Sequence, residues 1–244
     1  MRVIAIIPAR LNSKRFPKKL MKKINGIPLI LMTYQNLLAM NIFDEIVVAT
    51  DSLEISNTIK KNGGEVFISK KKHFCGSDRV SEASNNFKSD IVINVQGDEP
   101  FVNLKSIKKI INFFRDKINK NIPVVSLMYR TNDAAIIDNE NCVKVVTDKN
   151  SFAMYFSRSK IPFLRSLDKN FNFYIHIGVY GFLSKSIIQF SSLKPSKLEK
   201  IEMLECIRFI ENGQKIKMIQ TEKPTIGIDT PDDLIEAKKY LDSI

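Results

Sequence analysis

Five cationic side chains in one short stretch of the sequence have the chemistry to bind phosphate groups. They follow an apolar run at residues 3–7 and are Arg10, Lys14, Arg15, Lys18 and Lys19. Arginine can bind two phosphate oxygens at once and lysine acts as a point charge, so this stretch suits a triphosphate. The sequence contains neither the glycine-rich dinucleotide fingerprint nor the P-loop pattern. Spacing alone leaves a solvated basic loop as an equal alternative.

Two aspartates follow apolar runs and are candidate metal ligands. Asp98 comes shortly after residues 91–95, where a carboxylate is costly unless it has a partner. A magnesium ion is a natural partner, because proteins usually hold it with one or two carboxylates together with substrate phosphates. Asp229 occupies an analogous position after residues 226–228 and could be the second ligand. Its alternative role is that of a capping or turn residue before a helix.

Two further polar segments are weaker candidates. Residues 76–79 open a predicted helix, so their backbone N–H groups could contact a nucleotide, although Ser77 or Asp78 could equally be a plain N-cap. His176 lies in a strand-like run, where a histidine is more often a hydrogen-bonded structural residue than a base. The sequence lacks a Ser-His-Asp order, an H-E-x-x-H motif and a Cys/His cluster, which argues against a hydrolase.

Alternating strands and helices must position these residues in the first half of the chain. Apolar or β-branched runs predict strands at 3–7, 45–50, 66–68 and 91–95, and helical spacing predicts helices over 30–42, 77–86 and 107–118. This alternation predicts an α/β fold with three layers and a mostly parallel sheet. Ligands of such sheets bind at the carboxyl ends of the strands, where the basic stretch and Asp98 lie.

The second half of the chain is richer in strands. Strand-like runs at 124–129, 143–147, 152–156 and 174–182 predict an antiparallel insertion. A helix is expected over 201–211, ended by Asn212 and Gly213, and a short strand over 216–219. A last helix should begin at Pro231 after a Thr230 cap.

Composition limits the class of protein. The 244 residues, 44% hydrophobic and 26% charged, are typical of a soluble globular protein. No apolar run approaches the about 20 residues that cross a bilayer, so we expect no membrane insertion and a cytoplasmic location. The three cysteines lie far apart and predict separate thiols. The net charge of +12 permits nucleic-acid binding, but the lysines are scattered and no binding signature accompanies them, which favours a solvated surface and no nucleic-acid partner.

Eight sequence blocks together resemble one family, the cytidylyltransferases that activate 3-deoxy-D-manno-octulosonate (KDO). In chain order the blocks are IIPARLNSKRFPKKL, IVVATD, GSDRVSEA, VINVQGDEP, YFSRSKIP, HIGVYGF, LEKIEMLECIR and GIDTPDDL. The resemblance implies a nucleotide-diphospho-sugar transferase-like fold in a single cytidylyltransferase domain, residues 1–244. Within it, residues 1–123 and 200–244 would form the nucleotide-binding core, and residues 124–199 a smaller β-rich dimerisation and sugar-side region.

The same resemblance implies an activity and a set of site residues. The enzyme would transfer CMP from CTP to the anomeric hydroxyl of KDO, releasing pyrophosphate, with Mg2+ as cofactor and a homodimer as the assembly, for lipopolysaccharide synthesis. The residues matched to nucleotide binding are Pro8, Ala9, Arg10, Ser13, Arg15, Lys19, Ser77, Arg79 and Gln96. Those matched to the sugar are Gln96, Arg158, His176, Tyr180 and Glu205. Asp98 and Asp229 match the metal ligands and, with Arg10 and Lys19, the catalytic group.

The sequence departs from the family pattern at three positions. Lys18 stands where the family has glycine, so the loop must adopt a conformation that a lysine tolerates. Cys206 replaces a glutamine, which trades an amide for a weak thiol and predicts a changed sugar contact. Asp78 replaces a glutamate. Because of Cys206, an amino-KDO or sialic-acid type of acid sugar is the alternative substrate, and a basic nucleic-acid-binding protein is the remote alternative.

Overall fold

The computed structural model of the chain describes residues 1–13, 16–119, 121–165, 171–222 and 224–243. Its strands are β1 (Val3–Ala9), β2 (Lys23–Ile24), β3 (Ile27–Pro28), β4 (Glu45–Thr50), β5 (Glu65–Ile68), β6 (Ile91–Val95), β7 (Val124–Thr131), β8 (Lys144–Thr147), β9 (Ala153–Ser157), β10 (Phe173–Leu183) and β11 (Ile216–Thr221). Its helices are α1 (Leu29–Ala39), α2 (Leu53–Lys61), α3 (Gly76–Ser84), α4 (Leu104–Arg115), α5 (Ala134–Asp138), α6 (Ser184–Phe190), α7 (Lys197–Glu202), α8 (Cys206–Glu211) and α9 (Pro231–Asp242), with the short 3-10 helices η1 (Lys19–Met21) and η2 (Lys117–Asn119).

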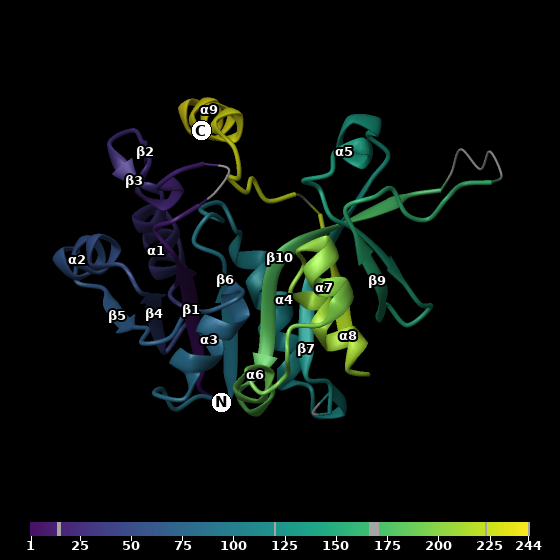
Figure 1. Ribbon diagram of the computed structural model, residues 1–244, viewed down its shortest axis with the longest axis horizontal. Helices are drawn as coiled ribbons and strands as arrows, with labels where there is room; N and C mark the ends of the chain where they lie inside the picture. Colours follow the sequence, from purple (N-terminus) through teal and green to yellow (C-terminus); the bar gives the residue numbers. More distant parts are fainter. Residues whose placement is uncertain (14–15, 120, 166–170, 223, 244) are drawn as a thin grey trace.

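A single main sheet, in the strand order β11-β7-β10-β6-β1-β4-β5, forms the centre of the fold (Figure 1). Strand β1 pairs in parallel with β4 and β6, and β4 pairs in parallel with β5. Strand β10 runs antiparallel between β6 and β7 and also pairs with β8, which in turn pairs with β9. The mostly parallel sheet and the antiparallel insertion are both confirmed.

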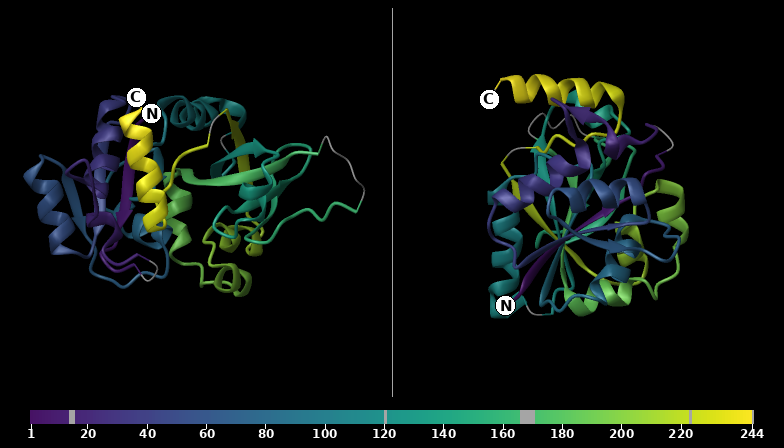
Figure 2. Two further views of the ribbon diagram at one scale, coloured as in Figure 1. Left: turned by 90° about the horizontal axis from the view of Figure 1, so that it is seen from above. Right: turned by 90° about the vertical axis from the view of Figure 1, so that its left-hand side faces the viewer.

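Alternation along β1 shows that the sheet is covered on both faces. Val3, Ala5 and Ile7 belong to one hydrophobic core, which also contains buried residues of α1, α2 and α4. Ile4 and Ile6 belong to the other core, which contains residues of α3, α6 and α8. Figure 2 shows helices on both sides of the sheet, so the three-layer prediction is confirmed. The division of the domain into residues 1–123 with 200–244 and residues 124–199 stays a prediction.

Most predicted elements are present, with strands β4 and β6 ending at the predicted residues. The single helix expected over 201–211 is wrong. Helix α7 ends at Glu202, because Met203 adopts a left-handed conformation with φ of 55°, and α8 starts again at Cys206. Ser77 and Asp78 are also not the N-cap of α3, because Cys75 takes that position and Asp78 closes a capping box with it.

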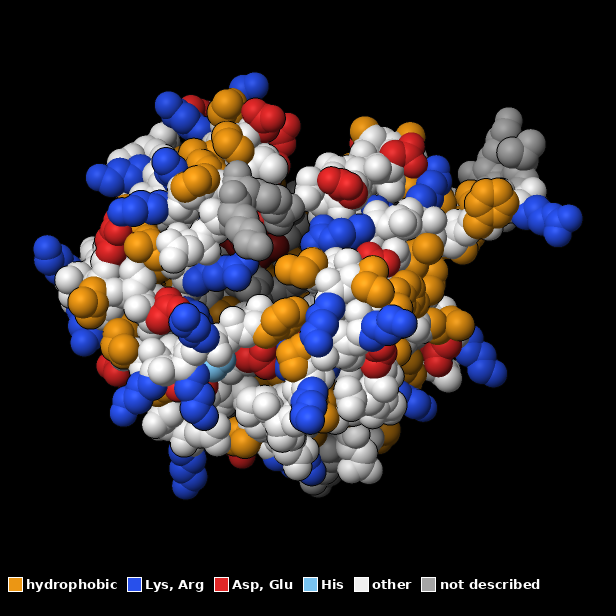
Figure 3. Space-filling model, in the orientation of Figure 1, with side chains coloured by type: hydrophobic (Ala, Val, Ile, Leu, Met, Phe, Trp, Pro, Cys, Tyr) orange, Lys and Arg blue, Asp and Glu red, His pale blue; other side chains and the backbone are white. Residues whose placement is uncertain are grey.

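The surface carries charge of both signs. On the face shown in Figure 3, Lys and Arg side chains are spread among acidic and apolar ones, and the face is hollowed between the part below α9 and the part below α5. Within the described ranges, no helix has the length and apolar character needed to cross a membrane.

The packing of β10 against α4 predicts that a methyl group at Gly181 is destabilising. A Cβ atom there would collide with Ile110 and would lie 2.9 Å from Phe114. We expect Gly181→Ala to lower the free energy of unfolding by about 1–3 kcal/mol, measured by urea denaturation.

Gly178→Ala, in the same strand, is the matched control, because its Cβ would meet only the Gln96 side chain at an ordinary 3.9 Å. Its stability should stay within about 0.5 kcal/mol of the wild type. Equal stability losses in the two variants would contradict this account of the packing.

Candidate active site

A lysine and two aspartates from three distant segments meet at one edge of the sheet. Lys19, in η1 after β1, donates hydrogen bonds from its ammonium group to Asp98 Oδ2 and, at 2.8 Å, to Asp229 Oδ1. Asp98 follows β6 and Asp229 precedes α9. The Lys19 side chain is only 10% exposed. A buried ammonium of this kind needs its carboxylate partners, because charge removed from water is costly when unpaired.

Backbone contacts hold the two aspartate segments together. The N–H of Ile228 donates to the carbonyl of Asp98 over 3.0 Å. Asp233, not Asp229, is the acidic residue of the helix cap: its Oδ2 accepts from the N–H groups of Asp229 and Thr230, both at 2.8 Å. Thr230 caps α9 as predicted. The Asp229 carboxylate is therefore directed to Lys19, whereas its neighbours begin the helix.

Protonation keeps the net charge of this cluster low. Burial lowers the pKa of Lys19, but the charges of Asp98 and Asp229 outweigh that effect, so the pKa is raised and the ammonium stays protonated. Glu99, which sequence analysis missed, lies beside them. Burial, with a further contribution from the Asp98 charge, raises the pKa of Glu99 to about 8, so this carboxyl group is mostly neutral at pH 7.

The basic stretch lies between β1 and this cluster. Arg10 is exposed directly after β1 and Ser13 is half-buried. Lys14 and Arg15 are outside the described residues. Lys18 adopts the left-handed conformation with φ of 53° and ψ of 33°, which costs a non-glycine residue about 1–2 kcal/mol, and its ammonium pairs with Glu54 at 2.9 Å. The chain therefore keeps at Lys18 the backbone conformation that glycine adopts freely.

A hydrogen-bonded chain of side chains runs from the end of β6 to the start of α8. Gln96 Nε2 donates to Asn94 Oδ1 over 3.2 Å, and Asn94 Nδ2 donates to Ser77 Oγ over 3.2 Å. Ser77 then donates to Glu205 twice, from its hydroxyl at 2.8 Å and from its backbone N–H at 3.0 Å. Sequence analysis missed Asn94, which is fully buried in the middle of this chain.

Gly76 allows the end of β1 to approach the same place. A Cβ atom on Gly76 would lie 2.8 Å from Gln96 Oε1 and 3.3 Å from the Pro8 ring. The small residue is required for this close approach. Pro8, Ser77, Gln96 and Glu205, which the family resemblance assigns to substrate binding, are therefore brought together by the fold.

Aromatic packing adds His176 and Tyr180 to this side of the site. Their ring centroids are 5.4 Å apart, and His176 also meets the Phe156 ring edge-on at 4.9 Å. Cys206 is 1% exposed and lies in the hydrophobic core that contains Tyr180. Burial raises the pKa of both groups, so the thiol is protonated.

The proton on His176 can be assigned from its neighbours. Ser126 Oγ lies 2.9 Å from both His176 Nε2 and the carbonyl of Val179. The carbonyl can only accept, so the single hydroxyl proton of Ser126 points to it and Oγ accepts from Nε2–H. The Nδ1 atom is then an acceptor. Burial lowers the pKa of His176 to about 3, so the ring is neutral at pH 7.

Two predicted site residues have their side chains in protein contacts. Arg79 forms a two-pronged ion pair with Asp51, at 3.1 and 2.9 Å, and also donates to the carbonyl of Ala9. Arg158 donates to the carbonyls of Glu202 and Glu140, at 2.9 and 3.0 Å, on the β9 side of the molecule. Their roles in substrate binding stay predictions.

The donor set fits a magnesium ion that is completed by substrate. Asp98 and Asp229 converge on one cation already, and hard carboxylate oxygens are the ligands that Mg2+ uses. Within the described ranges, no group of three or more His, Cys, Asp or Glu side chains could hold a metal. Two carboxylates supplemented by phosphate oxygens are therefore the arrangement that this edge of the sheet can provide.

Comparison with known proteins defines the class first. The cytidylyltransferase family model matches residues 4–216, and with the α/β fold it identifies the chain as a nucleotidyltransferase of the cytidylyltransferase class. Two relatives described as 3-deoxy-manno-octulosonate cytidylyltransferase are 46% and 43% identical. The one from Christiangramia forsetii matches 98% of this chain and 97% of its own length, and the one from Flavobacterium johnsoniae matches both chains completely.

A solved structure agrees with these relatives. CMP:2-keto-3-deoxy-manno-octonic acid synthetase complexed with CTP is 31% identical, has a TM-score of 0.91 and covers 100% of this chain and 99% of its own. The chain belongs to the 3-deoxy-manno-octulosonate cytidylyltransferase family.

The buried neutral histidine predicts a pH dependence of stability. The pKa of His176 is about 3 in the folded chain and about 6.5 when unfolded, so below pH 6.5 only the unfolded state binds the proton. This contribution to stability is complete above pH 6.5 and is lost as the pH falls towards 3. As the pH falls below 6.5, the unfolding equilibrium constant of the wild type should rise, relative to that of His176→Gln, by up to about tenfold for each pH unit. Urea titrations at pH 7.5, 6 and 5 measure it, and equal pH slopes for the two proteins would contradict the assignment.

Proposed function

We propose that the chain transfers CMP from CTP to the anomeric hydroxyl of KDO, giving CMP-KDO and pyrophosphate. The observation that carries the proposal is that Lys19, Asp98 and Asp229 meet at the carboxyl edge of the sheet in a chain of this family. Relatives of matching length carry the name of this activity, and the similar solved structure is described as a complex with CTP.

The cationic residues after β1 would bind the triphosphate. Arg10 is exposed, and a guanidinium fork can bind two phosphate oxygens, whereas the Lys19 ammonium is held in place by its two carboxylates. In-line attack of the sugar hydroxyl on the α-phosphorus breaks the bond to the pyrophosphate oxygen. Positive charge held near that oxygen stabilises the transition state without much reorganisation.

Asp98 and Asp229 would hold Mg2+ together with phosphate oxygens of CTP. When bound, Mg2+ neutralises charge on the phosphates and acidifies the attacking hydroxyl. The same two carboxylates also bind the Lys19 ammonium. The cation that would contact the phosphates and the two proposed metal ligands therefore lie in one cluster.

The side chains around Gln96 would bind the acid sugar. Glu205 supplies carboxylate oxygens for sugar hydroxyls, and His176 supplies a neutral ring whose Nδ1 atom accepts. Ser77, which the family resemblance matches to the nucleotide, holds the Glu205 carboxylate in place. We also propose Arg158 and Tyr180 on this side. Cys206 is buried in the same hydrophobic core as Tyr180, so we propose that its replacement of the family glutamine affects the sugar side through the packing of that core.

The assembly and the cellular context are further parts of the proposal. Exposed apolar side chains on β9, on the loop after β9, on α7 and at the C-cap of α7 support a homodimer; they are Met154, Phe163, Ile201 and Met203. A CTP-consuming enzyme works where nucleoside triphosphates are made, so we propose the cytoplasm, with CMP-KDO supplied for lipopolysaccharide synthesis.

Substitutions at the charged cluster test the proposed roles. We expect Asp98→Asn to lower kcat by at least about 100-fold, because it removes a charged ligand of the proposed Mg2+ site. We expect Lys19→Ala to raise KM for CTP by about tenfold or more, because it removes a cation that faces the phosphates. Pyrophosphate release measures both parameters, and circular dichroism checks the fold.

The matched control is Lys22→Ala, an exposed neighbouring lysine whose ammonium lies over the Phe16 ring. Its KM for CTP should stay within about threefold of the wild type. The roles are refuted if Asp98→Asn keeps normal turnover, or if the Lys22 variant loses CTP affinity as much as the Lys19 variant.

The alternative substrate is a related acid sugar of the amino-KDO or sialic-acid type, which Cys206 favours. Competing KDO with these sugars at equal concentration in the same reaction decides between them. Preferential consumption of KDO supports the proposal, and preferential consumption of another acid sugar replaces it.

A further inference from the structure

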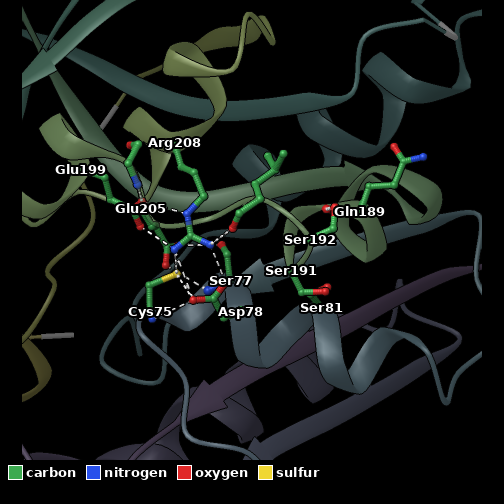
Figure 4. Close-up of polar contacts among 12 residues, drawn as sticks. Cys75, Ser77, Asp78, Ser81, Gln189, Ser191, Ser192, Glu199, Glu205 and Arg208 are labelled. Atoms are coloured by element: carbon green, nitrogen blue, oxygen red, sulfur yellow. Dashed lines mark hydrogen bonds and ion pairs between the residues drawn. The ribbon is translucent and has the colours of Figure 1, made fainter.

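A buried arginine lies next to the sugar side of the site (Figure 4). The Arg208 side chain is 1% exposed and stacks on the Phe190 ring at 4.2 Å. Its Nε and Nη2 donate to the two carboxylate oxygens of Glu199, at 2.8 and 2.6 Å. Its Nη1 and Nη2 donate to the two oxygens of Asp78, at 2.6 and 3.3 Å.

The two carboxylates of this ionic cluster have different structural consequences. Glu199 lies in α7, only nine positions before Arg208, so this ion pair joins neighbouring helices. Asp78 lies in the first turn of α3, 130 positions away, so this ion pair joins two distant segments. A buried guanidinium whose partner is removed is strongly destabilised, so α3 and α8 are held in one fixed arrangement.

A second contact between α3 and α8 contains two proposed site residues. Ser77, next to Asp78, donates twice to Glu205, the N-cap residue of α8. Glu205 is three positions before Arg208, so the two side chains lie on the same face of that helix. The Ser77–Glu205 and Asp78–Arg208 contacts therefore join α3 to α8 at two neighbouring positions. The helical break at Met203 allows Glu205 and Arg208 to face α3 together. Figure 4 shows Ser77, Asp78, Glu205 and Arg208 directed towards one another.

We propose that Arg208 is a positioning residue for the acid-sugar substrate: through Asp78 it fixes the first turn of α3, and so sets the orientation of Ser77 and Glu205. This inference rests on the proposed function. Ser77 is also bonded to Asn94, and Asn94 to Gln96, so the arrangement extends along the sugar side. The hydrogen bonds of Lys19 go to Asp98 and Asp229, outside this chain of contacts. A defect at Arg208 therefore weakens sugar binding and leaves triphosphate binding nearly intact.

The experiment compares Asp78→Asn and Arg208→Lys with Glu199→Gln as the matched control. Asp78→Asn and Arg208→Lys disturb the contact with α3, because lysine lacks the planar fork that binds both oxygens. Glu199→Gln removes a buried charge partner of the same arginine but keeps its contact with Asp78. We expect the first two to raise KM for KDO by at least about tenfold, with kcat within about threefold and a smaller rise in the Kd for CTP. Glu199→Gln should lower Tm yet leave KM for KDO within about threefold.

Amide hydrogen exchange at Ser77 gives a readout that does not depend on turnover. Its N–H is bonded to Glu205, so we expect exchange at Ser77 to be at least about tenfold faster in Arg208→Lys and unchanged in Glu199→Gln. A KM for KDO that rises as much in Glu199→Gln as in Arg208→Lys, or unchanged Ser77 exchange in Arg208→Lys, overturns the inference. If the wild type releases no pyrophosphate with KDO, the proposed function is wrong, and Ser77 exchange still decides whether Arg208 positions α3.

Discussion

The pairing of the Lys19 ammonium with Asp98 and Asp229 is the interaction on which the site depends. A buried ammonium without a carboxylate is costly, so the loop after β1, the loop after β6 and the segment before α9 must meet at one edge of the sheet. The backbone bond from Ile228 to Asp98 and the Asp233 cap of α9 make that meeting possible. The parallel order of β1 between β4 and β6 supplies the strand ends at which it occurs.

A second set of polar contacts, a hydrogen-bonded chain of side chains, also starts at the end of β6. It begins at Gln96, passes through buried Asn94 and Ser77, and ends at Glu205. The two systems suit the two substrates of a cytidylyltransferase: charged groups for a triphosphate, and hydrogen-bonding groups with an apolar wall for a sugar acid. Strand β6 is common to both, because Asn94 belongs to it and Asp98 follows it. Its five residues are all buried, which makes it a rigid base for the two halves of the site.

Sequence patterns predicted the elements well where one physical signal dominates. The apolar runs of β1 and β6 and the cap at Thr230 depend on local chemistry, and each begins where it was expected, although β1 continues beyond the predicted residue 7 through Pro8 to Ala9. The break at Met203 was missed, because a left-handed methionine has no local sequence signature. Arg208 and Asp78 were not recognised as a pair because their 130-residue separation hides the contact. Asn94 and Glu99 lie inside the sequence blocks that carry the family resemblance. Only the folded chain shows that buried Asn94 links Gln96 to Ser77 and that the Glu99 carboxyl group has a raised pKa.

The central claim concerns the bond that the enzyme makes, so the most direct measurement observes that bond. Phosphorus NMR of a reaction with CTP, Mg2+ and KDO labelled with carbon-13 at its anomeric carbon would follow the α-phosphorus of CTP. The account predicts a new phosphodiester resonance coupled to the labelled carbon, formed together with pyrophosphate. Release of free CMP without such a diester, or a diester formed with another acid sugar and never with KDO, would contradict it.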